Sequence, residues 1–545
     1  MKIKSILQSS LEKIFPESKP ENEHTNGSAL CGERYGFQLA LWTEDIGDIF
    51  LEVSAQSAEF DVSLFEVGLA PSVMPCFRFH DDDVITHSPG LFPDILFPYS
   101  EKIRLTWNKW KSIWVEVSVP ENAAAKTHEI KLTVKNIGGE HEIFIEKSFN
   151  LEVIGAVLPK QTLKRTEWFH NDCIAALHHV DVFCEEHWSL IHAYMKHAVR
   201  YGINMIYVPV FTPPLDTEIG GERPTVQLVD VFCEGNGYTF GFDKLLRYLN
   251  LAREAGFAHF EIAHLFTQWG AAHAPKIIGS KNGETVKLFG WETDAHGAEY
   301  SAFLNQFLPA LRAFLEGENL LDLCYFHISD EPNADNAESY KLSRNLVQDA
   351  LAGLKVMDAL SDVRFYDEGL VDIPVPGNNH IDDFLKRDID ERWVYYCSSQ
   401  DKEVSNRFFA MPSSRCRILG WQLFKFGIAG FLHWGFNFWF SQHSKAVINP
   451  YVTTDAGKAF PSGDSFVVYP GKDGPVSSLR LLTLYEALQD MRALELLATR
   501  LTRQEITDWL DAECGLSLSF SQYPRGDEDL LTLRQKLNEK IREVF

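Results

Sequence analysis

The feature that most restricts the fold of this chain is a change of pattern after Leu158-Pro159. Beyond this point, short apolar segments alternate with stretches of helical pattern, and such alternation favours parallel strands joined by helical crossovers. The expected strands are RTEWFH, INMIYVP, AHFEIAH, LCYFHIS, VRFYD, WVYYC and GFLHW, with DIPVPG near 372–377 as one more. The expected helices are 186–201, 242–256, 294–316 and 336–353. Seven or eight such units within residues 161–460 predict a (β/α)8 barrel of the TIM type.

The residues on either side of this barrel have other patterns. Residues 29–160 contain alternating or β-branched runs such as YGFQLALW, DIFLEVSA and HEIKLTVKN, which predict an antiparallel β-sandwich. Residues 1–28 are polar and are expected to form a loosely held tail or a short helix. Residues 461–545 are amphipathic and predict a helical C-terminal extension packed on the barrel. A chain of 545 residues is long enough for these separate domains.

Charge and composition exclude several classes of protein. The formal net charge of −25 would repel nucleic acid. The sequence lacks an apolar run long enough to cross a membrane, and its start has no secretory signal pattern. The nine Cys are scattered without a CxxC motif, which indicates reduced thiols. We therefore expect a cytoplasmic protein; self-association into a homo-oligomer stays open.

The sharpest local signal is the apolar run Cys324–Ile328, followed by Ser329, Asp330, Glu331 and Pro332. Proline ends the strand, so a barrel would place both carboxyl groups at its catalytic rim. Two adjacent carboxylates repel each other, which raises one pKa and gives a proton donor beside an anion, as glycoside hydrolysis requires. Neighbouring residues point in different directions, so the pair suits substrate assistance better than a nucleophile and acid facing each other. The alternative is a pair of ordinary surface acids at the start of a helix.

Residue types that bind sugars gather at the other expected strand ends. Aromatic rings can stack on a pyranose, and polar side chains can bind its hydroxyls, although any single one of them could instead be core. The candidate substrate-binding residues are Trp168, His170, Asn171, Asp216, His264, Gln268, Trp269, His327, Tyr395, Tyr396, Trp434, Asn437 and Trp439.

Motifs for metals and nucleotides are missing from the sequence. It contains no HExxH, Walker loop, Rossmann fingerprint or GxSxG elbow, so we expect neither a metal nor a cofactor. The run His80-Asp81-Asp82-Asp83 could hold a cation, but we interpret it as a solvated turn.

Longer blocks of sequence resemble glycoside hydrolase family 123, the β-N-acetylgalactosaminidases, and the wider uncharacterised domain family grouped with it. The resemblance covers about residues 160–500 and includes TEWFHNDC (166–173), FTPPLDT (211–217), ERPTVQLV (222–229), HLFTQWGA (264–271), HISDEP (327–332), SNRFFAMP (405–412), GFLHWGFNFW (430–439), PSGDSFVVYPG (461–471) and SLRLLTLYEALQDM (478–491).

The resemblance implies a β-sandwich before a barrel, and substrate-assisted, anomer-retaining hydrolysis without a metal. It places the acetamido-orienting role on Asp330 and the general acid/base role on Glu331. It also implies a tyrosine that binds the acetamido oxygen, for which Tyr395 and Tyr396 are both candidates. Members of the family are often exported, whereas this sequence shows no signal, which favours small imported glycans as substrates.

The leading expectation is thus an exo-acting β-N-acetylgalactosaminidase. One alternative is a glycosidase for β-GlcNAc or for a sugar without an acetamido group, which would need a separate nucleophile. The other is a carbohydrate-binding protein without activity, which the intact Asp330-Glu331 pair disfavours.

Overall fold

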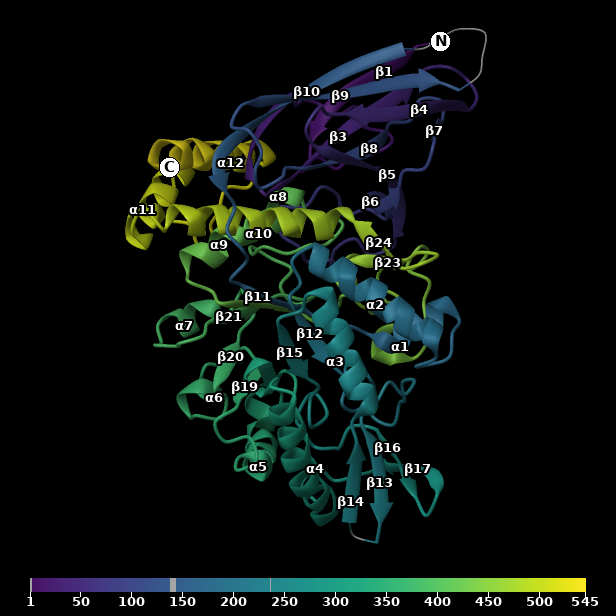
Figure 1. Cartoon of the computed structure of the whole chain (residues 1–545), viewed down its shortest axis with the longest axis vertical. Helices are drawn as coiled ribbons and strands as arrows, with labels where there is room; N and C mark the ends of the chain where they lie inside the picture. The colour runs from purple at the N-terminus through teal and green to yellow at the C-terminus, as the bar shows by residue number, and fades with distance from the viewer. Residues whose placement is uncertain (1, 138–143, 236) are drawn as a thin grey trace.

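The computed structural model describes residues 2–137, 144–235 and 237–545. It has an N-terminal region rich in sheet and a following region built on a nearly closed parallel barrel (Figure 1). The long helix α10 (Leu479–Leu497) runs between the two regions. This agrees with the expected order of a β region before a barrel, and the division into separate domains stays a prediction.

Two sheets make up the N-terminal region. The first has the strand order β1-β3-β8-β5-β6-β24-β23, and the second has the order β2-β10-β9-β4-β7. Their inward side chains share one core, in which Phe37 of the first sheet stacks on Phe149 of the second with ring centroids 4.2 Å apart. The strands are β1 (Ile3–Ser9), β2 (Asn26–Cys31), β3 (Arg34–Thr43), β4 (Ile49–Gln56), β5 (Asp61–Ser72), β6 (Gly90–Pro98), β7 (Ile103–Leu105), β8 (Lys111–Ser118), β9 (Thr127–Asn136), β10 (Phe144–Val157), β23 (Val468–Pro470) and β24 (Pro475–Ser478).

The expectation of a loose tail or short helix over residues 1–28 is wrong. Strand β1 pairs antiparallel with β3 in a register that runs from Ile3 opposite Thr43 to Ser9 opposite Phe37. Strand β2 pairs in parallel with β10, far along the chain. Burial of Leu7 in the shared core stabilises this start of the chain. The partners of both strands are distant in sequence, so local polarity did not reveal them.

The barrel sheet has eight strands in the order β20-β19-β18-β15-β12-β11-β22-β21. A parallel bridge between Gly377 and Tyr395 brings its two ends together and nearly closes it. The strands are β11 (Lys164–Glu167), β12 (Met205–Val208), β15 (His259–Ile262), β18 (Cys324–Phe326), β19 (Lys355–Ala359), β20 (Ile373–Val375), β21 (Trp393–Tyr395) and β22 (Gly430–His433).

One of the expected barrel strands is wrong. VRFYD does not form a strand, because Arg364–Asp367 is the short helix α6. The carboxylate of Asp362 accepts a hydrogen bond from the backbone N–H of Arg364 at 3.1 Å, a local contact that favours a turn. The fifth strand is instead β19, which lies just before it. The helix expected over 336–353 is α5 (Ala337–Val347), which ends early enough to leave room for that strand.

The helices between the barrel strands follow the sequence expectations closely. Those expected over 186–201, 242–256 and 294–316 are α2 (Glu185–Arg200), α3 (Asp243–Ala255) and α4 (Ala298–Gly317). The shorter helices are α1 (Asn171–His178), α7 (Ile381–Leu385), α8 (Ser413–Arg417) and α9 (Leu419–Lys425), with 3-10 turns at Leu321–Leu323, Ala334–Asn336 and Gln442–Ser444.

A small sheet that the sequence pattern did not predict extends from the barrel loops. Strands β13 (Asp230–Glu234) and β14 (Gly237–Gly241) follow β12, and strands β16 (Ile277–Lys281) and β17 (Glu284–Phe289) follow β15. They pair in the order β14-β13-β16-β17 at the end of the molecule opposite the N-terminal sheets (Figure 1). Long loops after β12 and β15 therefore have structure of their own.

The C-terminal part was expected to pack on the barrel, and in the structure it contacts the N-terminal region as well. Strand β24 pairs with β6 of the first N-terminal sheet, and α12 (Asp527–Val544) packs on β2 and β10 of the second. Helix α10 packs against α8 and α9 and is buried on nearly every side, so it is not an amphipathic surface helix. Helix α11 (Arg503–Cys514) packs on α12.

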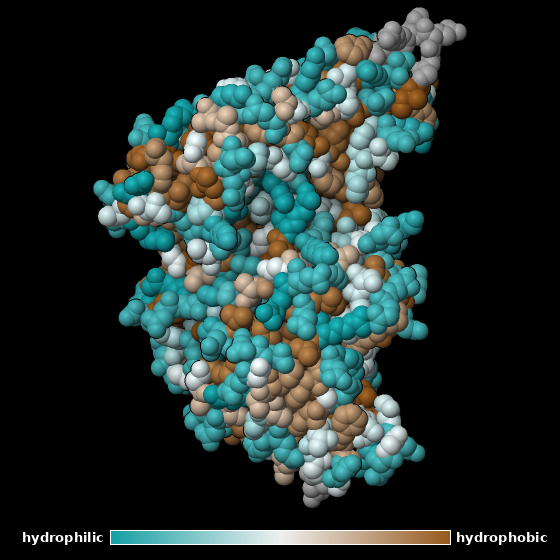
Figure 2. All heavy atoms as spheres, viewed as in Figure 1, coloured by the Kyte–Doolittle hydropathy of each residue, from teal (hydrophilic) through white to brown (hydrophobic). Residues whose placement is uncertain are grey.

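Buried ion pairs join these C-terminal helices to the rest of the chain. Asp490 of α10 binds Arg417 of α8 at 2.8 Å and Arg534 of α12 at 2.9 Å, and Arg534 also binds Glu33 at 2.8 Å. A polar cleft of about 990 Å³ lies next to this network, between α12 and the N-terminal strands. Figure 2 shows hydrophilic residues around this hollow.

Two further findings concern the chain as a whole. Among the described residues, all nine cysteines are free. Within the same residues, no helix combines the length and the apolar character that a membrane crossing requires.

Candidate active site

A pocket of about 130 Å³ opens at the carboxyl ends of the barrel strands. In a barrel of this kind, residues at these ends carry the chemistry, because the βα loops there converge. Its lining residues come from the ends of β11, β12, β15, β18, β19, β21 and β22 and the loops after them. They are Trp168, Leu215, Asp216, Gln268, Trp269, Asp330, Glu331, Ala359, Tyr395, Cys397, Ser398, Ser399, Leu432, Trp434 and Phe460. Asp330 and Glu331 thus lie in the same pocket, at the barrel end where we expected them.

The backbone around this carboxyl pair is held by the neighbouring strand β19. The side chain of Asp358 accepts hydrogen bonds from the backbone N–H groups of Ile328 at 3.1 Å and Ser329 at 3.5 Å. The carbonyl of Ala359 accepts the backbone N–H of Glu331 at 3.1 Å. Glu331 has a φ of 47°, in the left-handed region that a side chain other than glycine rarely adopts. Strand β19 therefore fixes an unusual backbone turn that directs two successive carboxyl groups into one pocket.

The two carboxyl groups differ in their surroundings. Burial and the adjacent Glu331 carboxylate raise the pKa of Asp330 well above its usual range, and the nearby His327 opposes this shift. Burial also raises the pKa of Glu331, whereas a hydrogen bond from Tyr395 lowers it. The Tyr395 hydroxyl donates this bond to Glu331 Oε1 at 2.8 Å. The pair can therefore hold a proton at higher pH than two exposed carboxyl groups would, as a general acid requires.

A buried row of charged side chains lies beneath the pair. His327 Nδ1 hydrogen-bonds to Asp358 at 3.0 Å, and its Nε2 hydrogen-bonds to Glu261 at 2.7 Å. Burial opposes a charge on His327, but these two hydrogen bonds outweigh it and raise its pKa to about 10. The indole N–H of Trp168 donates to Glu261 at 2.7 Å, which connects the row to the wall of the pocket.

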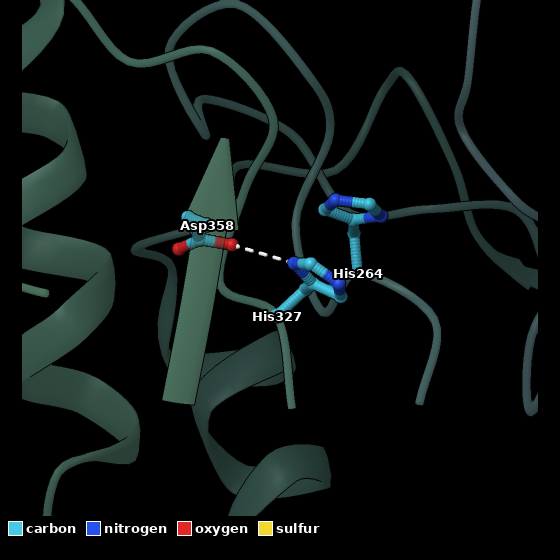
Figure 3. Close-up of side chains that lie close together, drawn as sticks. All are labelled: His264, His327 and Asp358. Carbon is cyan, nitrogen blue, oxygen red and sulfur yellow. Dashed lines mark hydrogen bonds and ion pairs between the residues drawn. The ribbon is translucent and has the colours of Figure 1, made fainter. Parts of the chain in front are cut away.

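His264, His327 and Asp358 come close enough to suggest a metal site, since their ligand atoms lie within 4.8 Å of one another. Figure 3 shows His327 pointing at Asp358, with the ring of His264 stacked over His327. Both nitrogens of His327 already bind carboxylates, and a protonated imidazole has no lone pair for a metal. Hydrogen bonding accounts for this cluster, so we assign it no metal.

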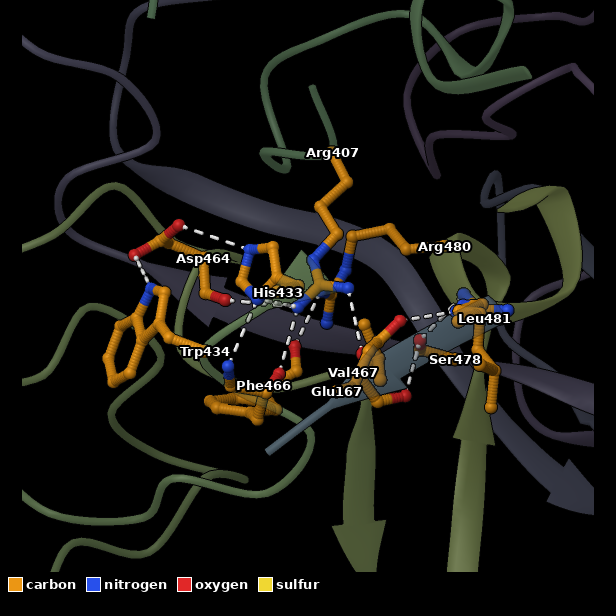
Figure 4. A network of polar contacts seen from close by, with 12 residues as sticks. Glu167, Arg407, His433, Trp434, Asp464, Phe466, Val467, Ser478, Arg480 and Leu481 are labelled. Atoms are coloured by element: carbon orange, nitrogen blue, oxygen red, sulfur yellow. Dashed lines mark hydrogen bonds and ion pairs between the residues drawn. The ribbon is translucent and has the colours of Figure 1, made fainter. Parts of the chain in front are cut away.

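The opposite wall of the pocket is Trp434, at the end of β22. Its indole N–H donates to Asp464 at 3.1 Å, and Asp464 also lies 3.6 Å from His433 Nε2 (Figure 4). Arg407 donates to His433 Nδ1 at 2.8 Å and pairs with Glu167 at 3.0 Å. Burial raises the pKa of Asp464 to about 7, against the lowering effect of Arg407. This network fixes the orientation of the indole.

Three lining residues at the rim of the pocket, Asp216, Gln268 and Trp269, are joined to His443, which lies just outside the lining. The backbone N–H of Asp216 donates to Gln268 Oε1 at 2.7 Å, and the Asp216 carboxylate accepts the backbone N–H of His443 at 2.9 Å. The His443 ring meets the Trp269 indole edge-on with centroids 5.9 Å apart. The loops after β12, β15 and β22 are thereby joined.

The structure divides the thirteen expected binding residues into three groups. Six of them line the pocket: Trp168, Asp216, Gln268, Trp269, Tyr395 and Trp434. Two lie in the barrel interior below it: His264 and His327. Five do not line it: His170, Asn171, Tyr396, Asn437 and Trp439.

These five residues pack against or hydrogen-bond to other buried groups, so we no longer expect them to contact a substrate. His170 is held between Arg223 and the carbonyl of Trp434, each at 3.0 Å. The Asn437 amide binds the backbone of His170, and the Asn171 amide contacts the Tyr248 hydroxyl. The Trp439 indole donates to the Val468 carbonyl at 3.2 Å. Tyr396 follows Tyr395 at the strand end and points to the other face, into the core beside Phe431.

Other residues of the pocket, and of the buried row beneath the carboxyl pair, were not predicted from the sequence. Cys397 is the last residue of the expected strand WVYYC, and Ser398 and Ser399 directly follow it, so the rule that strand ends line the site could have found all three. Asp358 was missed because this barrel strand was expected at VRFYD, whereas the strand is β19, which lies earlier in the sequence and contains Asp358. Glu261 lies within the expected strand AHFEIAH, where its charge among apolar neighbours was the available signal.

The family model "Glycoside hydrolase 123, catalytic domain" matches residues 168–497. A solved family 123 glycoside hydrolase from Clostridium perfringens, described in terms of glycolipid glycan hydrolysis, superposes with a TM-score of 0.75 at 16% identity, covering 99% of this chain and 98% of that chain.

A β-glucuronidase from Parabacteroides merdae aligns with a TM-score of only 0.31 at 12% identity, covering 84% of this chain and 50% of that chain. No curated protein matches the sequence significantly. The family model covers more than half of the 545 residues, and the similar structure shares the fold along nearly the whole chain. The chain therefore belongs to glycoside hydrolase family 123, and it is a glycosidase with a glycan substrate.

Proposed function

We propose that the protein is an exo-acting β-N-acetylgalactosaminidase that works by substrate-assisted, anomer-retaining hydrolysis. The observation that carries this proposal is the pair of successive carboxyl groups, Asp330 and Glu331, in one pocket, with Tyr395 bound to Glu331. One carboxyl group would act on the acetamido group and the other on the leaving oxygen, so the sugar itself would supply the nucleophile.

In the first step, the acetamido carbonyl oxygen attacks the anomeric carbon while the glycosidic C–O bond breaks. Glu331 gives its proton to the leaving oxygen, which suits a group whose pKa burial raises. Asp330 accepts the acetamido N–H and stabilises the positive charge of the oxazolinium intermediate. His327, as an imidazolium below Asp330, favours the ionised form of that carboxyl group.

In the second step, water attacks the anomeric carbon and gives its proton to Glu331, which restores the acid. The C–O bond of the oxazoline breaks, and the sugar leaves with its original anomeric configuration. Tyr395 lines the pocket whereas Tyr396 does not, so we assign the contact with the acetamido oxygen to Tyr395, whose single hydroxyl proton would then turn from Glu331 to the substrate. No step requires a metal or an organic cofactor.

The alternative is a glycosidase for a sugar without an acetamido group, and one specific observation favours it. Asp216 is a third carboxylate in the pocket, and it could act as the nucleophile for a sugar without an acetamido group. Burial raises the pKa of Asp216, which disfavours the anion that a nucleophile must be. Its carboxylate also binds the backbone of His443, which supports a structural role instead.

The two proposals differ in their response to an oxazoline mimic. A GalNAc-derived thiazoline resembles the cyclic intermediate, so a substrate-assisted enzyme should be inhibited competitively at concentrations well below the KM for an aryl glycoside. Absence of inhibition, together with cleavage of an aryl β-galactoside, would favour the Asp216 alternative. A GlcNAc-derived thiazoline in the same assay reports the choice between the two acetamido sugars.

A further inference from the structure

The polar cleft between α12 and the N-terminal strands is separate from the barrel pocket. Its volume of about 990 Å³ is far larger than the 130 Å³ of that pocket, and the two share no lining residue. Among the described residues that line the cleft, Leu531 is the only aliphatic one. A cleft of this volume has room for a small molecule, and its polar walls exclude an apolar one.

The buried charges at the floor of the cleft do not balance. Arg417 pairs with Glu486 at 3.0 Å and with Asp490 at 2.8 Å. Arg534 pairs with Glu33 at 2.8 Å and with Asp490 at 2.9 Å. All five side chains are buried. Three carboxyl groups thus share two guanidinium groups, which leaves one negative charge without a partner when all three are ionised.

Glu486 presents an unused oxygen to the cleft. Its Oε2 accepts hydrogen bonds from the Ser10 hydroxyl at 2.8 Å and from Arg417 at 3.0 Å. Its Oε1 accepts none from any described residue. A Cβ atom at Gly36 would lie only 2.9 Å from this Oε1, so glycine leaves the space beside it open. A side chain that is only 6% exposed and has a free acceptor indicates a donor supplied from outside the chain.

The positively charged side chains of the cleft already bind other groups of the protein. The two arginines at the floor bind the carboxylates beside them. Arg34 donates to the carbonyl of Arg200 at 2.9 Å, and Lys536 pairs with Glu513 at 2.6 Å. An anion would have to compete for these donors, whereas a cation would meet the free oxygen of Glu486. The charge pattern therefore favours a positively charged ligand.

We infer that this cleft binds a small amine with hydroxyl groups, whose ammonium group donates to Glu486 Oε1 and supplies the missing positive charge. The exposed side chains at the mouth of the cleft would bind its hydroxyl groups, and they include Asn26, Thr127, Asn150 and Thr532. The inference goes beyond the proposed function, because the cleft shares no residue with the pocket that holds Asp330 and Glu331.

The test compares the binding of glucamine and sorbitol to the full chain at equal ionic strength. The two molecules differ only in an ammonium group that replaces one hydroxyl group. Glucamine should raise the Tm until the site is saturated, whereas sorbitol should show no saturation over the same concentrations. In Glu486→Gln, the affinity for glucamine should fall about 10- to 100-fold, as for the loss of one charged hydrogen bond.

Glu528→Gln is the matched control for this substitution. It removes an exposed carboxylate from the mouth of the same cleft and should change the affinity by less than about twofold. Glu331→Gln is the control for the barrel pocket, and it should bind glucamine as the wild type does. Together the two controls distinguish binding at Glu486 from a general attraction of cations and from binding in the barrel pocket.

A second measurement needs no variant, because Glu486 must be ionised to bind an ammonium group. Burial raises the pKa of Glu486 to about 7, so the affinity for glucamine should rise about 10-fold between pH 6 and pH 8. An alkyl ammonium group stays charged over this range. Burial lowers the pKa of His24 to about 4 and raises that of Tyr35, so neither titrates there. The titratable and charged groups around Glu486 are Glu33, Asp490, Arg417, Arg534, Tyr35 and His24.

Three results would each overturn the inference: equal effects of glucamine and sorbitol, an unchanged affinity in Glu486→Gln, or an affinity independent of pH. Loss of glucamine binding in Glu331→Gln would also overturn it, because the ligand would then lie in the barrel pocket. None of these results bears on the proposed function, which is tested by hydrolysis.

Discussion

The hydroxyl of Tyr395 donates a hydrogen bond of 2.8 Å to Glu331, and this bond lowers a pKa that burial raises. In Tyr395→Phe the bond is lost, so the pKa of Glu331 should rise further. Glu331 must be protonated to act as the acid, so activity is lost as the pH rises through that pKa. The alkaline limb of the kcat/KM profile should therefore move to higher pH, in addition to a fall in rate. A profile that keeps its alkaline limb in place would contradict the assignment of Glu331 as the acid.

Tyr396→Phe is the matched control for this change. Tyr396 is the next residue, but its ring is buried in the core, and its hydroxyl has no hydrogen-bond partner among the described residues. The substitution should leave the pH profile unchanged. It thus separates the specific contact of Tyr395 from any general effect of removing a buried hydroxyl at this strand end.

Asp358 is a positioning residue, because its side chain holds the backbone of Ile328 and Ser329 just before the catalytic pair. It is also one of the two hydrogen-bonding partners that raise the pKa of His327. Asp358→Asn should lower kcat about 10- to 100-fold through misplacement of the pair, with a smaller effect on KM. It should also shift the acid limb of the pH profile to lower pH, because the negative charge of Asp358 raises the pKa of Asp330, whereas His327 keeps its second carboxylate partner, Glu261.

Tyr340→Phe provides the comparison for Asp358→Asn. The Tyr340 hydroxyl donates to Asp358 Oδ2, which also accepts the backbone N–H of Ser329, and its removal leaves the carboxylate and both backbone donors in place. We expect a loss of thermal stability with little change in the acid limb. If Asp358→Asn loses stability but keeps the wild-type pH profile, Asp358 has only a structural role.

The ion-pair network of Asp490 should determine much of the stability of the C-terminal helices. Asp490 is fully buried between Arg417 and Arg534, so Asp490→Asn leaves two guanidinium groups without their shared carboxylate. Removal of one partner from a buried pair costs about 3–5 kcal/mol, measurable by denaturant unfolding. Asp383→Asn, which removes the exposed pair with Lys386, should leave the unfolding midpoint unchanged. Equal effects of the two substitutions would contradict this role for the network.

Local pattern predicted much of the barrel because its strands are short apolar runs between helices of the expected period. Seven expected barrel segments coincide with strands, including the DIPVPG segment at β20. The error at VRFYD arose because that segment alternates like a strand, whereas the side chain of Asp362 turns it into a helix. Because the strand was expected at VRFYD, Asp358 of β19 was not predicted as a strand-end residue. The pairing of β1 with β3 joins residues that lie 28 to 40 positions apart, from Ser9 opposite Phe37 to Ile3 opposite Thr43, and no local pattern contains such a pairing.

The candidate site was predicted only in part, because local pattern locates the strand ends but does not fix which side chains face the pocket. The strand-end rule located Asp330, Glu331, Trp168, Tyr395 and Trp434 in the pocket. The rule cannot tell which of two successive residues faces inward, because side chains alternate along a strand and the register is set by the neighbouring strands. Tyr395 and Tyr396 illustrate this limit: they are adjacent in sequence, yet one binds Glu331 and the other lies in the core.

The most direct test of the central claim is the rate of hydrolysis of aryl β-GalNAc, β-GlcNAc and β-galactoside by the wild type, Asp330→Asn and Glu331→Gln. We expect β-GalNAc to be cleaved with retention, β-galactoside to resist, and each substitution to lower kcat/KM about 10²- to 10⁴-fold. Between two aryl β-GalNAc substrates that differ in the leaving group, the one with the better leaving group should lose less kcat/KM in Glu331→Gln. The departure of a better leaving group needs less help from an acid. Cleavage of β-galactoside but not of the acetamido sugars, or full activity in either variant, would contradict substrate assistance by Asp330 and Glu331.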